Sequence, residues 1–237
     1  MMINPPFTTL QTIHTLLLTH VSSDQNKAKM FFKTSPGSYS ENDQFLGVKV
    51  PVLRKIAKSL SHLSLEELKE LLYSPFNEER LLSLFILVDK YQQADLVTRD
   101  AIAKFYIDNL TQVNNWNLVD SSAHLILGPY LENKNRQLLK DYALSNNLWY
   151  RRVSILSTLH FIRQHDLVTT FEIAQLLLSD PHDLIHKAVG WMLREAGKRN
   201  EDQLLDFLER NYKYMPKTMF RYSIAKLDHG LISKIIA

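Results

Sequence analysis

The stretch YRRVSIL, residues 150–156, decides the fold, because four other stretches of the chain superpose on it. They are EERLLSL (78–84), LVDSSAH (118–124), IHKAVGW (185–191) and MFRYSIA (219–225). Each stretch carries a charged residue at its third position within an apolar helical pattern, and these positions recur every 32 to 40 residues. This is the period of a repeat built from two helices. The sequence therefore predicts helix pairs stacked in series, which form an α-solenoid.

Helical periodicity extends along most of the chain and predicts an all-α protein. The predicted helical segments are 64–74, 77–92, 98–110, 116–127, 135–145, 148–164, 171–180, 184–198, 201–212 and 217–227. Ser64 and Glu67 form a capping box at the start of the first of these. Residues 33–51 are rich in Ser, Gly, Pro and Asn and predict a loop. The tetratricopeptide signature is absent, so we describe the repeats as HEAT-like and treat residues 1–237 as one domain.

Composition excludes several classes of site. The chain has 237 residues, 45% of them hydrophobic, which is enough for a substantial core, and it has no cysteine. Disulfides, iron–sulfur clusters and thiolate nucleophiles or zinc ligands are therefore excluded. No apolar run approaches the roughly 20 residues of a membrane span, and no signal peptide is recognisable at the N-terminus. We expect a cytoplasmic protein without a membrane partner.

Stacking should place the third positions of the five stretches in one row. These positions are Arg80, Asp120, Arg152, Lys187 and Arg221. A single charged side chain is ordinarily just solvated. Four cations that recur in register instead predict a concave basic groove for an extended anion, and a nucleic-acid backbone is the natural ligand. Lys217 adds a further cation near the end of the row.

Two tryptophans lie one helical turn from members of this row. Trp116 precedes Asp120 by four residues, and Trp191 follows Lys187 by four. Tryptophan is usually a core residue, but an indole face also packs on a sugar or attracts a cationic base. Asp120 has two interpretations. It forms a structural ion pair with Arg152, or it stabilises positive charge on a bound sugar or base.

Signals for metal or cofactor binding are weak. His182 and His186 have a spacing that occurs in zinc sites, but neither an adjacent catalytic glutamate nor a third ligand accompanies them. We interpret them as solvated or capping histidines. No nucleotide-binding glycine loop and no nucleophile elbow occurs. We expect no metal and no cofactor.

Three longer stretches carry a resemblance to a known family: VNNWNLVDSSAHLILGPYL, LWYRRVSILSTLHFIR and HKAVGWMLREAGKR. With them, nearly the whole chain resembles the HEAT-like-repeat DNA alkylation-repair glycosylases of the AlkD type. This resemblance implies an enzyme that cleaves the N-glycosidic bond of purines alkylated at N3 or N7 in duplex DNA. It also implies that the reaction uses no metal and no deep base-flipping pocket.

The resemblance assigns roles to individual residues. It implies that Trp116 and Trp191 pack against the lesion nucleotide, that Asp120 is the catalytic carboxylate, and that Arg152 holds the DNA. Phe31 stands where some members carry a DNA-contacting tyrosine, and therefore lacks its hydroxyl. Asn117 replaces an aspartate that is common after the tryptophan.

One carboxylate suits this chemistry. Ordinary glycosidases also need an acid that protonates the leaving group. A purine alkylated at N3 or N7 is already cationic and leaves as a neutral base, so stabilising the sugar cation and directing water suffice. Two alternatives stay open: a non-catalytic solenoid that binds damaged or branched DNA, and a scaffold for protein interactions. We expect a monomer bound to duplex DNA.

Overall fold

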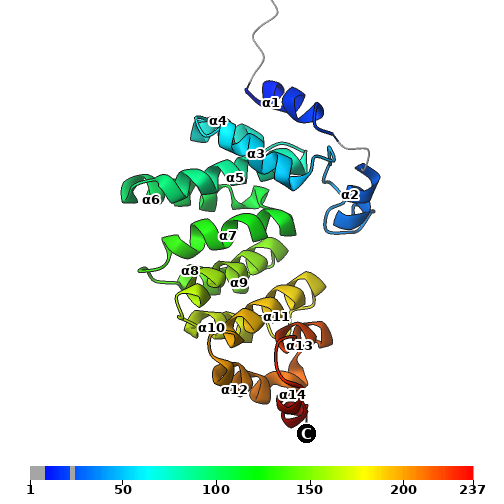
Figure 1. The fold of residues 1–237 in the computed structure, drawn as a ribbon, viewed down its shortest axis with the longest axis vertical. Coiled ribbons are helices and arrows are strands. Elements are labelled where there is room, and N and C mark those ends of the chain that lie inside the picture. Colours follow the sequence, from blue (N-terminus) through cyan, green and yellow to red (C-terminus); the bar gives the residue numbers. More distant parts are fainter. Residues whose placement is uncertain (1–8, 22–24, 237) are drawn as a thin grey trace, which may run out of the picture. The chain divides into compact units, whose positions relative to one another are not determined.

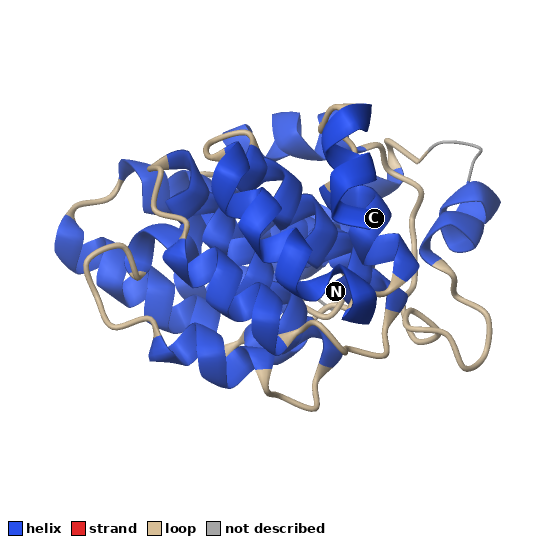
Figure 2. Cartoon of the chain, turned by 90° about the horizontal axis from the view of Figure 1, so that it is seen from below, coloured by secondary structure: helices blue, strands red, loops and turns tan. Residues whose placement is uncertain are grey.

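The computed structural model describes residues 9–21 and 25–236. Within these ranges the protein consists of helices and loops, with an isolated bridge between Gln44 and Phe76 and no strand (Figure 2). The all-α prediction is confirmed. None of the described helices is long and apolar enough to cross a membrane.

The chain divides into two compact units, residues 1–122 and 123–237, and the division falls within α7. The described helices of the first unit are α1 (Thr9–Leu18), α2 (Gln25–Phe32), α3 (Val50–Ser59), α4 (Leu65–Leu72), α5 (Asn77–Gln93), α6 (Leu96–Asp108), η1 (Leu110–Gln112) and the start of α7 (Trp116–Tyr130). Those of the second unit are α8 (Gln137–Ala143), α9 (Leu148–Arg163), α10 (Val168–Leu176), α11 (Asp183–Gly197), α12 (Glu201–Asn211), η2 (Tyr212–Tyr214), α13 (Lys217–Ser223) and α14 (His229–Ile236).

Helix α5 forms the core of the first unit. Its residues 77–88 are all buried, as expected for a helix whose apolar residues surround its axis. Helices α3, α4 and α6 pack against it, and α1 packs on α4 (Figure 1). The first turn of α5 is therefore covered by neighbouring segments of the first unit.

Helix α9 has the same position in the second unit. Residues 152–159 are buried, and helices α8, α10 and α11 pack around it. Helix α11 in turn packs against α12 and α13. Within each unit, helices that are close in the chain pack together, as expected of the helix pairs that the repeats predicted.

The predicted repeat register agrees with the helix boundaries. Asp120, Arg152, Lys187 and Arg221 are each the fifth residue of their helix, and Arg80 is the fourth residue of α5. The capping box at Ser64 and Glu67 is also confirmed, since both reciprocal hydrogen bonds form.

Some helix ends differ from the prediction. Helix α7 continues through Pro129 to Tyr130 instead of ending at residue 127. Pro129 cannot donate a hydrogen bond to the carbonyl of Leu125, and α7 ends one residue after it. Helix α10 begins at Val168, three residues early, and α13 ends at Ser223, four residues before the predicted end. Ends depend on tertiary packing, which periodicity does not report.

Close packing of α11 on α13 depends on Gly190. A Cβ atom at this position would lie 2.5 Å from the carbonyl oxygen of Met219 and 2.5 Å from Cβ of Tyr222. We expect Gly190→Ala to lower the free energy of unfolding. Overpacking costs about 1–3 kcal/mol, whereas the higher helix propensity of alanine stabilises the fold by at most about 1 kcal/mol. Urea denaturation measures the difference.

Gly230→Ala is the matched control. The nearest atom to its added Cβ would be a carboxylate oxygen of Asp228 at 3.1 Å, the mobile end of a side chain. This variant should unfold at the same or a higher urea concentration than the wild type. Equal effects of the two substitutions would contradict the packing role of Gly190.

Candidate functional site

The site begins with four consecutive polar residues in the first turn of α5. Asn77, Glu78, Glu79 and Arg80 are all buried. Buried polar groups require hydrogen-bond partners, so this turn must bind other parts of the first unit. Glu79 accepts a hydrogen bond from the Ser74 hydroxyl and pairs with His14 of α1, whose Nδ1 lies 2.6 Å away.

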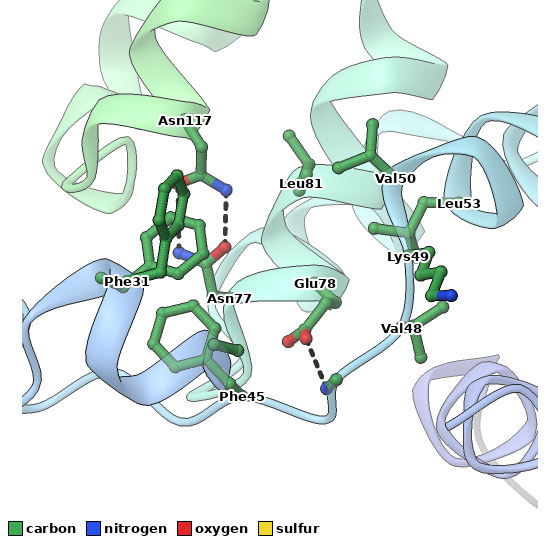
Figure 3. A pocket seen from close by; sticks show the side chains of 13 residues that line it. Phe31, Phe45, Val48, Lys49, Val50, Leu53, Asn77, Glu78, Leu81 and Asn117 are labelled. Carbon is green, nitrogen blue, oxygen red and sulfur yellow. Dashed lines mark hydrogen bonds between the residues drawn. The ribbon is translucent and has the colours of Figure 1, made fainter. Parts of the chain in front are cut away.

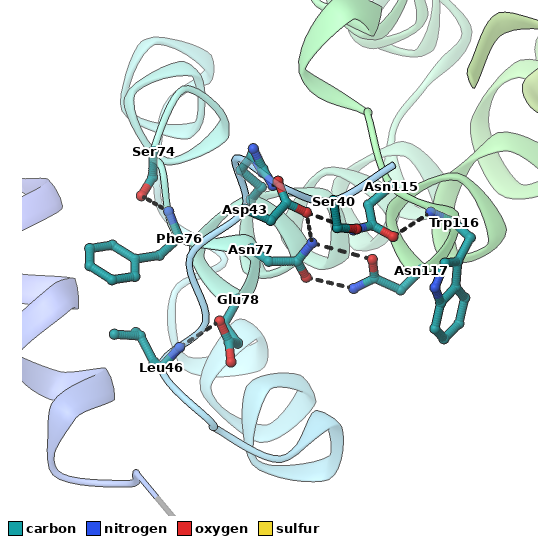
Figure 4. A network of polar contacts seen from close by, with 11 residues as sticks. Ser40, Asp43, Leu46, Ser74, Phe76, Asn77, Glu78, Asn115, Trp116 and Asn117 are labelled. Atoms are coloured by element: carbon teal, nitrogen blue, oxygen red, sulfur yellow. Dashed lines mark hydrogen bonds and ion pairs between the residues drawn. The ribbon is translucent and has the colours of Figure 1, made fainter. Parts of the chain in front are cut away.

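Asp43, in the loop between α2 and α3, is the centre of this polar network (Figure 4). Its Oδ1 accepts a hydrogen bond of 2.5 Å from Arg80, and its Oδ2 accepts bonds of 2.6 Å from Asn115 and 3.2 Å from Asn77. Both members of the ion pair are about 6% exposed. One buried carboxylate thus joins the loop, α5 and the residue that precedes α7.

Asn115 fixes the start of α7. Its side-chain amide donates to Ser40 at 2.7 Å as well as to Asp43. Its Oδ1 accepts the backbone N–H of Trp116 at 2.7 Å. All three hydrogen bonds of this fully buried side chain therefore hold the first residue of α7 against the loop.

Asn117, where the resemblance leads one to expect an acid, pairs with Asn77. The two side-chain amides donate to each other, at 2.7 Å from Asn117 to Asn77 and at 3.4 Å in the reverse direction (Figure 4). A carboxylate at this position could not donate the shorter bond, and it would place a second negative charge close to Asp43. Asn117 therefore has a structural role in this chain, which is to link the first turn of α7 to the first turn of α5.

Trp116 belongs to an aromatic stack with Phe31, Phe32 and Phe45. The ring centroids of Trp116 and Phe32 are 5.0 Å apart with an interplanar angle of 16°, and Phe45 stacks on Phe32 at 4.6 Å. Phe31 meets Trp116 edge to face at 5.4 Å. The stack holds the half-buried indole in one orientation, and the Phe31 side chain is 67% exposed.

Asp120 is half-buried and follows Trp116 by one turn of α7, so the two side chains share a face of the helix. Ser122 donates to the carbonyl of Leu118 at 2.7 Å and lies 2.9 Å from the Tyr106 hydroxyl of α6. The turn that carries Asp120 is therefore anchored before it, through Asn115 and Asn117, and after it, through Ser122.

Two cations of the predicted row are buried. Arg80 is 5% exposed and paired with Asp43. Arg152 is also 5% exposed, and its guanidinium donates to the backbone carbonyl of Leu184 in α11 at 2.6 Å. Both residues have structural contacts that the alignment did not reveal. Their contact with DNA stays a prediction.

The other predicted DNA-binding cations are more accessible. Lys217 and Arg221 are exposed on α13, and Lys187 pairs with Asp183 at 2.6 Å on α11. Trp191 is half-buried and lines a small cavity with Arg163 and Arg199. The DNA contacts of these four residues therefore stay predictions.

The capping interpretation of His182 is confirmed. This residue precedes α11, and its Nδ1 accepts the backbone N–H of Leu184 at 3.1 Å. His186 lies 2.5 Å from the backbone carbonyl of Asp180. Among residues 9–21 and 25–236, no group of three or more His, Asp or Glu side chains is placed to hold a metal ion.

Glu78 binds the loop through backbone groups. Its carboxylate accepts the N–H of Leu46 at 3.0 Å and that of Gly47 at 2.7 Å. Gly47 has φ +87°, a conformation that favours glycine. Burial raises the pKa of Glu78 above its ordinary value of 4.5, and the two backbone N–H groups oppose this shift more weakly.

The raised pKa of Glu78 predicts a pH-dependent stability. The folded protein holds this proton more tightly than the unfolded chain, so the contribution of Glu78 to the free energy of unfolding falls as pH rises from about 4.5 through the folded pKa. Urea denaturation across pH 4–8 measures wild type minus Glu78→Gln. This difference should fall with rising pH. A difference that rises with pH would contradict the shift.

Several residues of the site were not predicted from the sequence. They are Ser40, Asp43, Asn77, Asn115, Phe32 and Phe45. The available signal was the run NEER, four polar residues that open an otherwise apolar helix. Such a run requires buried partners, but the partner loop carried no periodic pattern that could identify it.

A comparison with protein families decides the identity of the chain. The sequence profile of a family described as DNA alkylation repair enzyme matches residues 15–227. The protein belongs to this DNA alkylation repair family. Membership supports a role in DNA repair and an enzymatic activity, and it points to DNA as the partner. A comparison with curated proteins found no match.

The fold is shared with a solved structure described as "Predicted DNA alkylation repair enzyme from Enterococcus faecalis". The TM-score is 0.68, and the alignment covers 89% of this chain and 98% of that chain. Sequence identity is 15%, so the likeness concerns the fold alone.

Proposed function

We propose that this member of the repair family is a DNA glycosylase that hydrolyses the N-glycosidic bond of N3- or N7-alkylated purines in duplex DNA. The observation that carries the proposal is the pairing of Asp120 with Trp116 on one anchored face of α7. A fixed carboxylate next to a fixed indole suits a cationic sugar flanked by a cationic base.

The proposed reaction breaks the bond between C1′ and the base nitrogen. The bonding electrons go to the base, which loses its positive charge and leaves neutral without a general acid. Asp120 stabilises the oxocarbenium-like sugar and accepts a proton from the water that attacks C1′. Trp116 supports the lesion nucleotide. In this proposal Arg152 and Trp191 hold the DNA near the lesion, as their resemblance to family positions suggests.

Release of bases from methylated DNA tests the proposal. Duplex DNA treated with a methylating agent is incubated with the protein, and released bases are identified by chromatography and mass spectrometry. We expect 3-methyladenine, 7-methylguanine or both, and none from unmethylated DNA. The absence of any released methylated base would overturn the glycosylase assignment.

The same preparation separates the alternatives. A non-catalytic DNA binder would bind duplex DNA with an affinity that falls as salt rises, yet release no base. A protein-interaction scaffold would show no such affinity, and replacing Lys217 and Arg221 by alanine would change nothing. A DNA glycosylase should bind duplex DNA less tightly in this double variant, because both cations are exposed on α13, where they are accessible to phosphate groups.

A further inference from the structure

A cavity of the first unit has a volume of about 440 Å³. It is lined by α2, the loop that precedes α3, the first turn of α3, the start of α5 and Asn117 of α7 (Figure 3). Cavities of about 300–1,000 Å³ with mostly apolar walls and a few polar groups are typical of small-molecule sites. Neither Trp116 nor Asp120 is among its lining residues.

The walls of the cavity suit a flat ring. In Figure 3, Phe31 and Phe45 lie on one side, and Val48, Val50 and Leu53 lie on the other. Aromatic and branched aliphatic side chains on opposite sides favour a planar, largely apolar ligand. A flexible or highly charged ligand would gain little from these walls.

Polar groups gather at one part of the lining. Asn117 uses one of its two amide hydrogens and one acceptor site of its oxygen on Asn77. A second hydrogen and a second acceptor site therefore remain on the same amide. Glu78 lines the cavity beside this pair. Neighbouring donors and acceptors are also what the edge of a purine presents.

From these contacts we propose that the cavity binds a free purine-type base, the product of the reaction at Asp120. The inference rests on the proposed function. We assign the detached base because Asp120, beside which the proposed reaction places the sugar, does not line the cavity. Occupation of the cavity by released base would make the product an inhibitor.

Calorimetric titration with free 3-methyladenine tests the proposal. We expect saturable binding to the wild type. Val50→Trp should weaken binding by about tenfold or more, because Val50 lines the cavity and the larger indole side chain would occupy part of its volume. Val50 is 46% exposed, so the substitution should not disturb the core. Val97→Trp is the matched control, since Val97 is 81% exposed on α6 and does not line the cavity.

Inhibition of base release gives a second readout. Added 3-methyladenine should slow release from methylated DNA by the wild type and by Val97→Trp, but not by Val50→Trp. Circular dichroism and thermal unfolding check that both variants fold. No saturable binding to the wild type, or equal binding to Val50→Trp, would overturn the proposal.

A duplex that contains 2-aminopurine distinguishes a detached base from one still on the strand. Its fluorescence rises when the base leaves the stack. We expect no rise that depends on Val50, and such a rise would overturn the assignment to a free base. Base release without purine binding would refute the cavity proposal alone. Purine binding without base release would refute the glycosylase alone.

Discussion

Asp120→Asn should bind methylated duplex DNA as tightly as the wild type, or more tightly, while base release falls by about a hundredfold or more. The amide has nearly the shape of the carboxylate but neither its charge nor its capacity to accept a proton from water. Loss of the charge removes repulsion toward phosphate and removes stabilisation of the sugar cation. Single-turnover release of bases and a DNA-binding titration measure the two effects.

Asp108→Asn is the matched control for this variant. Asp108 is an exposed carboxylate at the end of α6 in the same unit. Its substitution removes the same charge without changing α7, so base release should not change. Full activity of Asp120→Asn, or an equal loss in both variants, would refute the assignment of Asp120 as the catalytic carboxylate.

Removal of the Asp43 side chain should lower the free energy of unfolding by about 3–5 kcal/mol, the usual cost of breaking one side of a buried ion pair. Asp43→Ala leaves the Arg80 guanidinium buried without its counter-charge and deprives the amides of Asn77 and Asn115 of an acceptor. Urea denaturation at neutral pH measures the loss.

Two further variants separate the ion pair from general effects of alanine. Asp206→Ala breaks an exposed pair with Arg210 on α12 and should cost less than about 1 kcal/mol. The double variant Asp43→Leu with Arg80→Met removes both charges and should be more stable than Asp43→Ala. If Asp43→Ala unfolded like the wild type, the network would not hold the first unit together.

The part of the structure set by local patterns could be predicted from the sequence. Apolar spacing predicted the helices, Ser64 and Glu67 predicted the cap of α4, and the repeat alignment placed Asp120 and Arg152 at equivalent helix positions. The helices and the cap depend on residues within a few turns of one another. The repeat register depends on comparing five such stretches, and none of these features requires knowledge of which distant side chains make contact.

The partners of the buried charges could not be predicted in this way. Arg80 and Asp43 are 37 residues apart, and Asn115 reaches Ser40 across 75 residues. The repeat alignment placed Arg80 in the predicted basic groove, yet its guanidinium is buried against Asp43. Equivalent positions in a repeat share backbone geometry, but a loop inserted before one helix changes what its side chain contacts.

The loop of residues 33–49 has the composition of a linker, yet its side chains and backbone bind the first turn of α5 and Asn115, the residue that precedes α7. Linker-like segments are usually the places where a chain tolerates a cut, a tag or new termini. This one is an exception. Splitting the protein here would disturb the contacts that hold the start of α7, which carries both the indole and the carboxylate. Engineered versions should therefore carry their insertions elsewhere, such as the polar turn between α7 and α8.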